Sequence, residues 1–444
     1  MNKKKIAITG AGISGLFTAY RLHENGYEVK VFENNKLGGD IQYTTIDDKH
    51  YPVSTLFTYL FGSDYVNHLV LQTNTKFKQK RALLGGETIT PFSIIPILYG
   101  FILYIIIYII LIIIPIQSSL TAKDFSNLGT KQFLKVIIEP ITIAYGVTDN
   151  FNKDDTNFEK LTLHHLFTIC PPGIMLDFLL GMKFHLTPLL SDKGYYDIVE
   201  LLAKNLDIEY TSISKIDRVN KRIYYNNIYY SYDKLIISCK PHDIRNIMHY
   251  DKREQALVSP YSRNDFITIL VKCTYENDKS GFINFIDKEK LQIFSCVFLD
   301  DNIVLFPCNL KPRDISNKKI FNFLKKNNFK NIEIIKIFTW ETGEHYRDQR
   351  IKEYIRYHLQ GINDTYYVGK LVTGTGYVDD IIEYSDKLLG QYFTVISYRP
   401  TIIQRFINRV LIVKRSDCNF IYDYDLVIKI IIVCFLIWMI YSNY

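Results

Sequence analysis

The sequence predicts an α/β fold, with a Rossmann-like domain built on a parallel sheet and an α+β domain built on an antiparallel sheet and helices. Three observations support this prediction. The chain opens with an apolar strand, a glycine turn and an amphipathic helix. A second glycine segment follows an apolar strand near residue 370. Between them, short apolar runs at 208–216, 222–225, 228–231, 266–275 and 303–308 alternate with polar turns, as antiparallel strands do.

Length and composition limit the number of domains and the kinds of partner that the chain is expected to have. A chain of 444 residues is too long for one compact core, so two or three domains are expected. The formal net charge of +7 accompanies an ordinary charged fraction of 22%, so composition does not indicate a nucleic-acid partner. The seven cysteines are scattered without zinc or redox spacing. We therefore predict no metal site and expect reduced thiols.

The N-terminal motif is a strand, a glycine turn, a helix and a second strand that ends in an acid. Gly10 allows the sharp turn after the first strand, and Gly15 lets the helix pack closely on that strand. Gly12, with Ile13 and Ser14 after it, opens the helix, where free N–H groups and the helix dipole favour a pyrophosphate. Glu33 ends the second strand, where a carboxylate accepts hydrogen bonds from ribose hydroxyls. The motif predicts a bound dinucleotide.

A glycine pair, Gly38 and Gly39, follows this motif at a place where a nicotinamide enzyme does not need one. The whole pattern resembles the flavin-containing amine oxidase superfamily, which includes monoamine oxidases, protoporphyrinogen oxidases and phytoene desaturases. The resemblance implies that the dinucleotide is FAD. One residue departs from the superfamily pattern, because Asp40 stands where an arginine usually follows the glycine pair. The superfamily's opening pattern is matched by Gly10, Gly12, Gly15, Ala19, Gly26 and Glu33.

The second glycine segment resembles the part of the superfamily that closes over the ribityl chain and pyrophosphate. Gly369, Gly376 and Tyr377 match its pattern, whereas Lys370 stands where an acidic residue is usual. The helix that follows would direct its N-terminus at the flavin and stabilise negative charge there. Tyr377 falls where amine oxidases place one wall of an aromatic substrate cage. A core tyrosine is the alternative in a chain with 34 tyrosines.

Two further positions come from the same resemblance. Ile213, in the first strand of a predicted meander, matches an apolar residue that contacts the adenine. Lys272, inside the apolar strand 266–275, matches a lysine that holds a water against the flavin, and a solvent-facing lysine is the alternative. Residues 340–346 contain no cysteine of the kind that bonds covalently to flavin in some monoamine oxidases, so non-covalent binding is expected.

The predicted domains are discontinuous. Residues 1–75, 190–265 and 355–398 form the expected FAD-binding domain, and residues 76–189 and 266–354 form the expected substrate domain. The segment 399–444 is expected to be a basic amphipathic stretch followed by a C-terminal transmembrane anchor at 426–442.

The stretch 92–116 lies in a region without charged side chains and has the hydropathy of a transmembrane helix. A single crossing there would put the two halves of the FAD-binding domain on opposite sides of a membrane. We therefore expect a buried substrate-domain helix, a paired span or, as the favoured alternative, a monotopic insertion in lipid. Together with the predicted anchor, this stretch predicts a tail-anchored membrane protein with its catalytic body in the cytosol.

The predicted function is an FAD-dependent oxidoreductase, amine oxidase-like, that transfers a hydride from an amine or another apolar substrate to flavin, with oxygen as acceptor. Lys272 and Tyr377 are its candidate catalytic residues. The expected partners are an apolar or lipid-like small molecule and a membrane, and no nucleic acid. Two alternatives remain, a lipid or polyprenoid desaturase or isomerase of the same superfamily and a non-catalytic nucleotide-binding membrane protein. The oligomeric state is left open.

Overall fold

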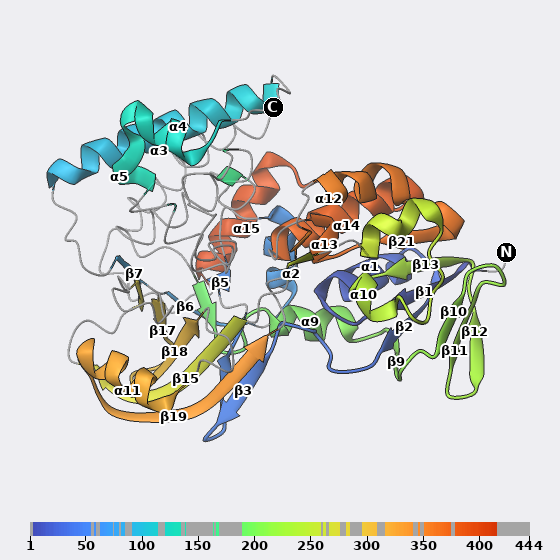
Figure 1. Ribbon diagram of the computed structural model, residues 1–444, viewed down its shortest axis with the longest axis horizontal. Coiled ribbons are helices and arrows are strands. Elements are labelled where there is room, and N and C mark those ends of the chain that lie inside the picture. Colours follow the sequence, from blue (N-terminus) through green and yellow to red (C-terminus); the bar gives the residue numbers. More distant parts are fainter. Residues whose placement is uncertain are drawn as a thin grey trace.

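The structure of the protein is a computed structural model (Figure 1). It describes residues 3–54, 57–58, 63–73, 75–79, 81–84, 91–113, 120–134, 138, 163, 166–167, 189–258, 261–262, 266–275, 281–284, 295–308, 316–340, 345–346, 350–373 and 378–414.

The centre of one domain is a five-stranded parallel sheet of order β21-β13-β1-β2-β9. The alternating side chains of its strands enter two separate apolar clusters. Ile6 and Ile8 point to one face, whereas Ala7 and Leu235 point to the other. Burial on both faces explains why these strands read as continuous apolar runs and confirms the predicted Rossmann-like sheet. The strands are β1 (Lys5–Thr9), β2 (Glu28–Glu33), β9 (Asp207–Tyr210), β13 (Lys234–Ile237) and β21 (Thr365–Tyr367).

Helices cover the first face of this sheet. The helix after the glycine turn, α1 (Ile13–Glu24), packs against α14 (Val378–Tyr392) and α9 (Tyr196–Ala203). Outside them, α15 (Ile402–Lys414) packs on α2 (Asp64–Gln72).

The second face is covered by an antiparallel meander and several short helices. The meander consists of β10 (Lys215–Asp217), β11 (Arg222–Tyr225) and β12 (Ile228–Ser231), and it extends from one end of the molecule in Figure 1. The helices η5 (Lys252–Val258) and η7 (Ile355–Leu359) complete the same apolar cluster. This face therefore buries residues that the sequence places far apart.

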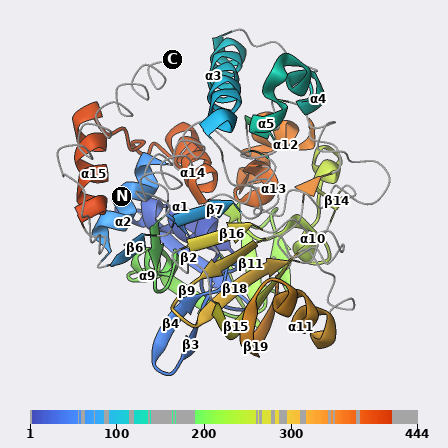
Figure 2. The same cartoon turned by 90° about the vertical axis from the view of Figure 1, so that its left-hand side faces the viewer.

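A six-stranded sheet forms the second domain, in the order β19-β15-β18-β17-β16-β7. One face packs on α11 (Asn317–Lys326), which lies against β19 in Figure 2. The other face meets β4 (Lys49–Pro52), part of a hairpin with β3 (Tyr43–Ile46). The Oγ1 of Thr268 donates to the carbonyl oxygen of Val53 at 2.9 Å, which ties the two domains together. The strands are β7 (Arg81–Leu84), β15 (Phe266–Tyr275), β16 (Gly281–Asn284), β17 (Ser295–Phe298), β18 (Ile303–Cys308) and β19 (Phe329–Trp340).

The apolar stretch forms one long helix, α3 (Pro91–Ile113). One side packs on an aromatic cluster in which Tyr104 is fully buried, with its ring centroid 4.5 Å from that of Phe167 and 5.6 Å from that of Phe133. A Cβ added at Gly100 would lie 2.3 Å from the Cβ of Phe133, so the helix approaches this cluster closely. The other side exposes large apolar residues such as Ile102, which is 56% exposed.

The predicted membrane location is wrong on this structure. Among the described residues, no helix is both long and apolar enough to cross a membrane. Hydropathy alone does not detect that α3 uses one side to bury aromatic residues of its own domain. The helix α15 also differs from a surface-lying basic helix, because Arg409 is 1% exposed and bonded to Asp64. The predicted anchor 426–442 lies outside the described residues and has no support in the structure.

Candidate dinucleotide-binding site

The glycine turn lies at the carboxyl end of β1, where parallel strands place ligands. Gly10 has φ +93°, and its N–H donates to the carbonyl oxygen of Phe32 at 2.8 Å. A Cβ at Gly15 would lie 2.0 Å from the carbonyl oxygen of Gly10, so only glycine fits there. Gly12 precedes α1 as its N-cap, and a Cβ added to it would meet nothing within 4 Å. The turn is tightly packed below and open at Gly12.

Ser14 links the turn to the next two strands of the sheet. Its Oγ lies 2.8 Å from the Oγ of Ser238, which follows β13. A Cβ at Gly369, just beyond β21, would lie 3.1 Å from the same Ser14 oxygen, and Gly369 has φ +96°. Ile13 is 8% exposed and belongs to the apolar cluster under α1. The two glycine segments predicted from the sequence therefore meet at Ser14.

Glu33 is held beside the turn by backbone donors. Its Oε2 accepts from the N–H of Ala11 at 2.6 Å and its Oε1 from the N–H of Asn35 at 2.7 Å. Two carboxylate oxygens offer about four lone-pair sites, so each can accept one more hydrogen bond from a ribose hydroxyl. Glu33 is 7% exposed. It is a buried, oriented acceptor at the end of β2.

The second glycine pair packs on the first turn. The N–H of Gly38 donates to the carbonyl oxygen of Ala11 at 2.9 Å, and Gly38 forms an isolated parallel bridge with Gly12. A Cβ at Gly39 would lie 3.3 Å from the Cα of Gly12. Both glycines have positive φ, +87° and +58°. This contact leaves the N-terminus of α1 lined by backbone alone, which suits a phosphate group.

Ile213 follows β9 close to the base of Glu33. The N–H of Thr211, two residues earlier, donates to the carbonyl oxygen of Glu33 at 2.8 Å. Ile213 is half-buried at the edge of the apolar cluster below the sheet. The segments that carry Gly12, Glu33, Ile213 and Gly369 thus leave the same edge of the sheet, and these residues fit a dinucleotide.

Of the remaining predicted residues, Lys370 lies next to this site and Lys272 lies in the second sheet. Lys370 begins the short helix α13 (Lys370–Thr373) directly after Gly369 and is partly buried. Gly376 and Tyr377 lie outside the described residues. Lys272 is exposed, in register with Ile303 and Glu333 in the second sheet. Because Lys272 is exposed, it needs no buried partner. Its expected role beside the flavin stays a prediction.

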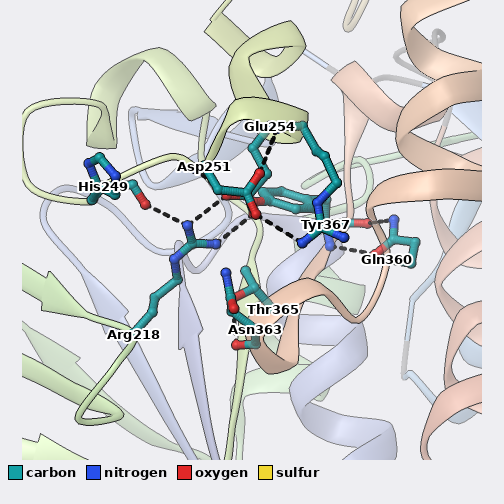
Figure 3. A network of polar contacts seen from close by, with 9 residues as sticks. Arg218, His249, Asp251, Glu254, Gln360, Asn363, Thr365 and Tyr367 are labelled. Atoms are coloured by element: carbon teal, nitrogen blue, oxygen red, sulfur yellow. Dashed lines mark hydrogen bonds and ion pairs between the residues drawn. The ribbon is translucent and has the colours of Figure 1, made fainter.

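One buried polar network was not found from the sequence (Figure 3). Both terminal nitrogens of Arg218 donate to the two carboxylate oxygens of Glu254, each at 2.6 Å. Tyr367 donates to the same carboxylate at 2.8 Å, and Arg218 also donates to the carbonyl oxygen of His249. Glu254 is fully buried. The network holds β21 two residues before Gly369, and no spacing rule connects its members in the sequence.

A second feature missed from the sequence is the acidic start of α14. The Oδ1 of Asp379 accepts from the N–H of Ser63 at 2.6 Å. Loss of surrounding water raises the pKa of Asp379 to about 7, and the nearby carboxylates Asp380 and Glu383 act in the same direction. The hydrogen bond from Ser63 opposes these effects. A carboxyl with this pKa exchanges protons near neutral pH.

Comparisons with known proteins agree with this architecture. Residues 8–72 match a family described as NAD(P)-binding Rossmann-like domain. No match to the sequence is found among the curated proteins. The N-terminal part of the chain therefore resembles a Rossmann-like domain.

Solved structures extend the similarity over most of the chain. A fatty acid isomerase from P. acnes, described as producing CLA, has a TM-score of 0.70 at 16% identity over 88% of this chain and 99% of that one. Putrescine oxidase bound to putrescine has a TM-score of 0.62 at 12% identity, with 88% and 99% covered. Reduced UDP-galactopyranose mutase has a TM-score of 0.56 at 12% identity, with 88% and 94% covered. The protein has the fold of the flavin amine oxidase-like superfamily, as its glycine segments predict.

Proposed function

We propose that this protein is an FAD-dependent oxidoreductase that acts on an apolar small molecule. The observation that carries the proposal is the contact of Gly38 and Gly39 with the turn at Gly12, together with the close approach of Gly369, at the end of β21, to Ser14. A nicotinamide dinucleotide needs only the first turn and Glu33. Three converging glycine segments favour a longer, more enclosed cofactor, and FAD fits this description.

The residues take separate roles in this proposal. Gly10, Gly12, Gly15 and the N-terminus of α1 hold the pyrophosphate. Glu33 binds the ribose and Ile213 supports the adenine, whereas Gly369 and Lys370 lie toward the flavin end. The resemblance assigns Gly376 and Tyr377 to that end, and we propose that binding is non-covalent. Asp40 is exposed and leaves the pyrophosphate without the usual arginine, so the backbone of the turn carries more of the binding.

When bound, FAD supplies the capacity to accept a hydride from a substrate C–H bond, and oxygen is the proposed final acceptor. The protein orients the substrate and excludes water, with Lys272 and Tyr377 as the proposed catalytic residues. The second domain packs on the loop after β4 through Val53. The resemblance to amine oxidases suggests an amine as the substrate.

A second candidate is the isomerisation of an apolar acid without net oxidation. The observation that favours it is the TM-score of 0.70 to a fatty acid isomerase, against 0.62 to putrescine oxidase bound to putrescine. Either reaction uses the same cofactor site. They differ in whether the electrons removed from the substrate pass to an external acceptor or return to the same molecule.

The first experiment is reconstitution with FAD. We expect the purified protein to show bound-flavin absorbance after FAD is added and the excess is removed, whereas added NADH is not retained. The flavin is then mixed anaerobically with a panel of amines and a panel of unsaturated fatty acids. Bleaching by one panel supports oxidation, and a rearranged product without bleaching supports isomerisation. A protein that stays colourless with FAD contradicts the proposed function.

A further inference from the structure

Lys352 is a buried cation that the site described above does not use. It lies in α12 (Arg350–Tyr354), which continues into η7, and it is 9% exposed. Across the described residues, no acceptor bonds to its ammonium group and no carboxylate forms an ion pair with it. A buried charge without a partner costs free energy, so such a residue contributes little to folding.

The helix face that carries Lys352 is directed at the cofactor segment. Arg356, four residues later, donates from Nε to the carbonyl oxygen of Val372 and from Nη2 to that of Thr373, both at 2.8 Å. Residues four apart share one face of a helix, so Lys352 lies on the same side. Val372 and Thr373 end α13, which begins directly after Gly369. The ammonium is therefore presented beside the segment that follows the glycine contact.

The charges around Lys352 leave it short of negative partners. Burial lowers the pKa of its ammonium, and the neighbouring Arg356 lowers it further. Glu353 and Asp380 raise it, but they do not compensate for these two effects. A desolvated ammonium next to a second cation attracts an incoming anion and repels a protonated amine.

We propose that Lys352 receives the carboxylate of the substrate, and that the substrate is an apolar monocarboxylic acid and not an amine. This inference rests on the proposed function, because it places the acid beside the cofactor segment. In this proposal the ammonium donates to the carboxylate of the acid. The other anion that would pair with the Lys352 ammonium is the negatively charged part of the bound cofactor. The experiment distinguishes this anion from the substrate carboxylate.

The test compares dodecanoate with its methyl ester, which has the same chain but no charge. Binding of each is measured by calorimetry at pH 7, below the micellar concentration, to the full-length protein with and without FAD. The variants are Lys352→Met, Lys352→Arg and, as a matched control, Lys319→Met, which removes an exposed lysine in α11. Thermal unfolding checks that each variant is folded.

We expect Lys352→Met to weaken dodecanoate binding at least about 10-fold, because hydrogen bonds to charged groups contribute roughly 1.5–3 kcal/mol. Binding of the ester is expected to change less than about 2-fold, because it makes no charge-assisted bond. Lys352→Arg retains the charge and most of the affinity, and Lys319→Met behaves as wild type. Carboxylate binding to wild type also weakens as pH rises through the lowered pKa of Lys352, whereas Lys352→Arg stays flat.

Three results would overturn the proposal. Equal losses for acid and ester would assign Lys352 to packing, and unchanged dodecanoate binding would remove it from recognition. Weakened FAD binding with intact dodecanoate binding would assign the charge to the cofactor. Failure of the proposed function is distinct, since a protein that binds dodecanoate through Lys352 but never retains FAD refutes only the oxidoreductase.

Discussion

Gly12 and Gly15 stand in one turn, yet the structure gives opposite reasons for the missing side chain. A Cβ at Gly15 would lie 2.0 Å from the carbonyl oxygen of Gly10, whereas a Cβ at Gly12 would meet nothing within 4 Å. Gly12 has φ −72°, which alanine adopts without strain. Packing therefore requires Gly15, and only a bound ligand requires Gly12.

This difference predicts two separable phenotypes. Gly12→Ala is expected to leave the free energy of unfolding unchanged or to raise it by about 0.4–1 kcal/mol. The same change is expected to lower FAD affinity at least about 10-fold, because the new methyl group occupies the place where the pyrophosphate approaches the backbone. Gly15→Ala is expected to lose about 1–3 kcal/mol through overpacking. Urea unfolding measures the stability of each variant, and equilibrium dialysis measures its FAD affinity. A Gly12→Ala protein with normal FAD affinity would contradict the assigned site.

Residues were predictable where chemistry depends on local spacing. Gly10, Gly12, Gly15 and Glu33 belong to one strand–turn–helix–strand unit, so the sequence itself shows their relation. Glu254 and Lys352 had no such signal. Their roles depend on burial and on partners from distant parts of the chain, and the periodicity of the sequence records neither.

At the scale of elements, the sequence predicts the type and order of the strands better than it predicts what packs against them. The predicted strands 222–225, 228–231, 266–275 and 303–308 coincide with β11, β12, β15 and β18. The strand expected at 208–216 is instead two shorter strands, β9 and β10, because residues 211–214 leave one sheet and enter another. The stretch 92–116 was recognised as a helix, but its aromatic partners lie beyond any local pattern.

The first turn of α14 makes stability depend on pH. The pKa of Asp379 is about 7 in the folded protein against an ordinary value of 3.8, so the folded state binds more protons between these values. The free energy of unfolding is therefore expected to fall as pH rises from about 4 to about 7, and this contribution stays lost above pH 7.

The variant Asp379→Asn tests this dependence, because its side-chain oxygen still accepts from Ser63 but does not titrate. Urea unfolding at several pH values is expected to show a flatter profile for Asp379→Asn than for wild type. Asp207→Asn, which changes a carboxylate with a 63% exposed side chain, serves as the control and should keep the wild-type slope. An unchanged slope in Asp379→Asn would show that another group sets the pH dependence.

At the scale of the whole molecule, buried polar contacts join segments that the sequence separates widely. Arg218 extends from the meander, Glu254 lies in η5, and Tyr367 ends β21 (Figure 3). Burial alone would lower the pKa of Arg218, but its bonds to Glu254 hold that pKa above its ordinary value. The guanidinium therefore stays charged under the sheet and depends on one carboxylate.

This dependence predicts a large and specific loss of stability. Glu254→Gln leaves Arg218, with its side chain only 7% exposed, without its counter-charge, and breaking one side of a buried pair costs about 3–5 kcal/mol. The double variant Arg218→Met with Glu254→Leu removes both charges and is expected to lose less than Glu254→Gln alone. Arg253, in the same helix as Glu254, forms a surface pair with Asp251, which directly precedes that helix, and Arg253→Gln should cost about 0–1 kcal/mol.

Urea unfolding of these three variants separates a buried pair from surface charge. Because Tyr367 precedes Gly369 by two residues, the network also fixes the strand end that meets Ser14. Glu254→Gln should therefore weaken FAD retention even at temperatures where the variant is folded, and the double variant should restore part of it if packing alone positions β21. Equal stability losses for Glu254→Gln and Arg253→Gln would mean that the buried carboxylate does not hold the meander, η5 and β21 together.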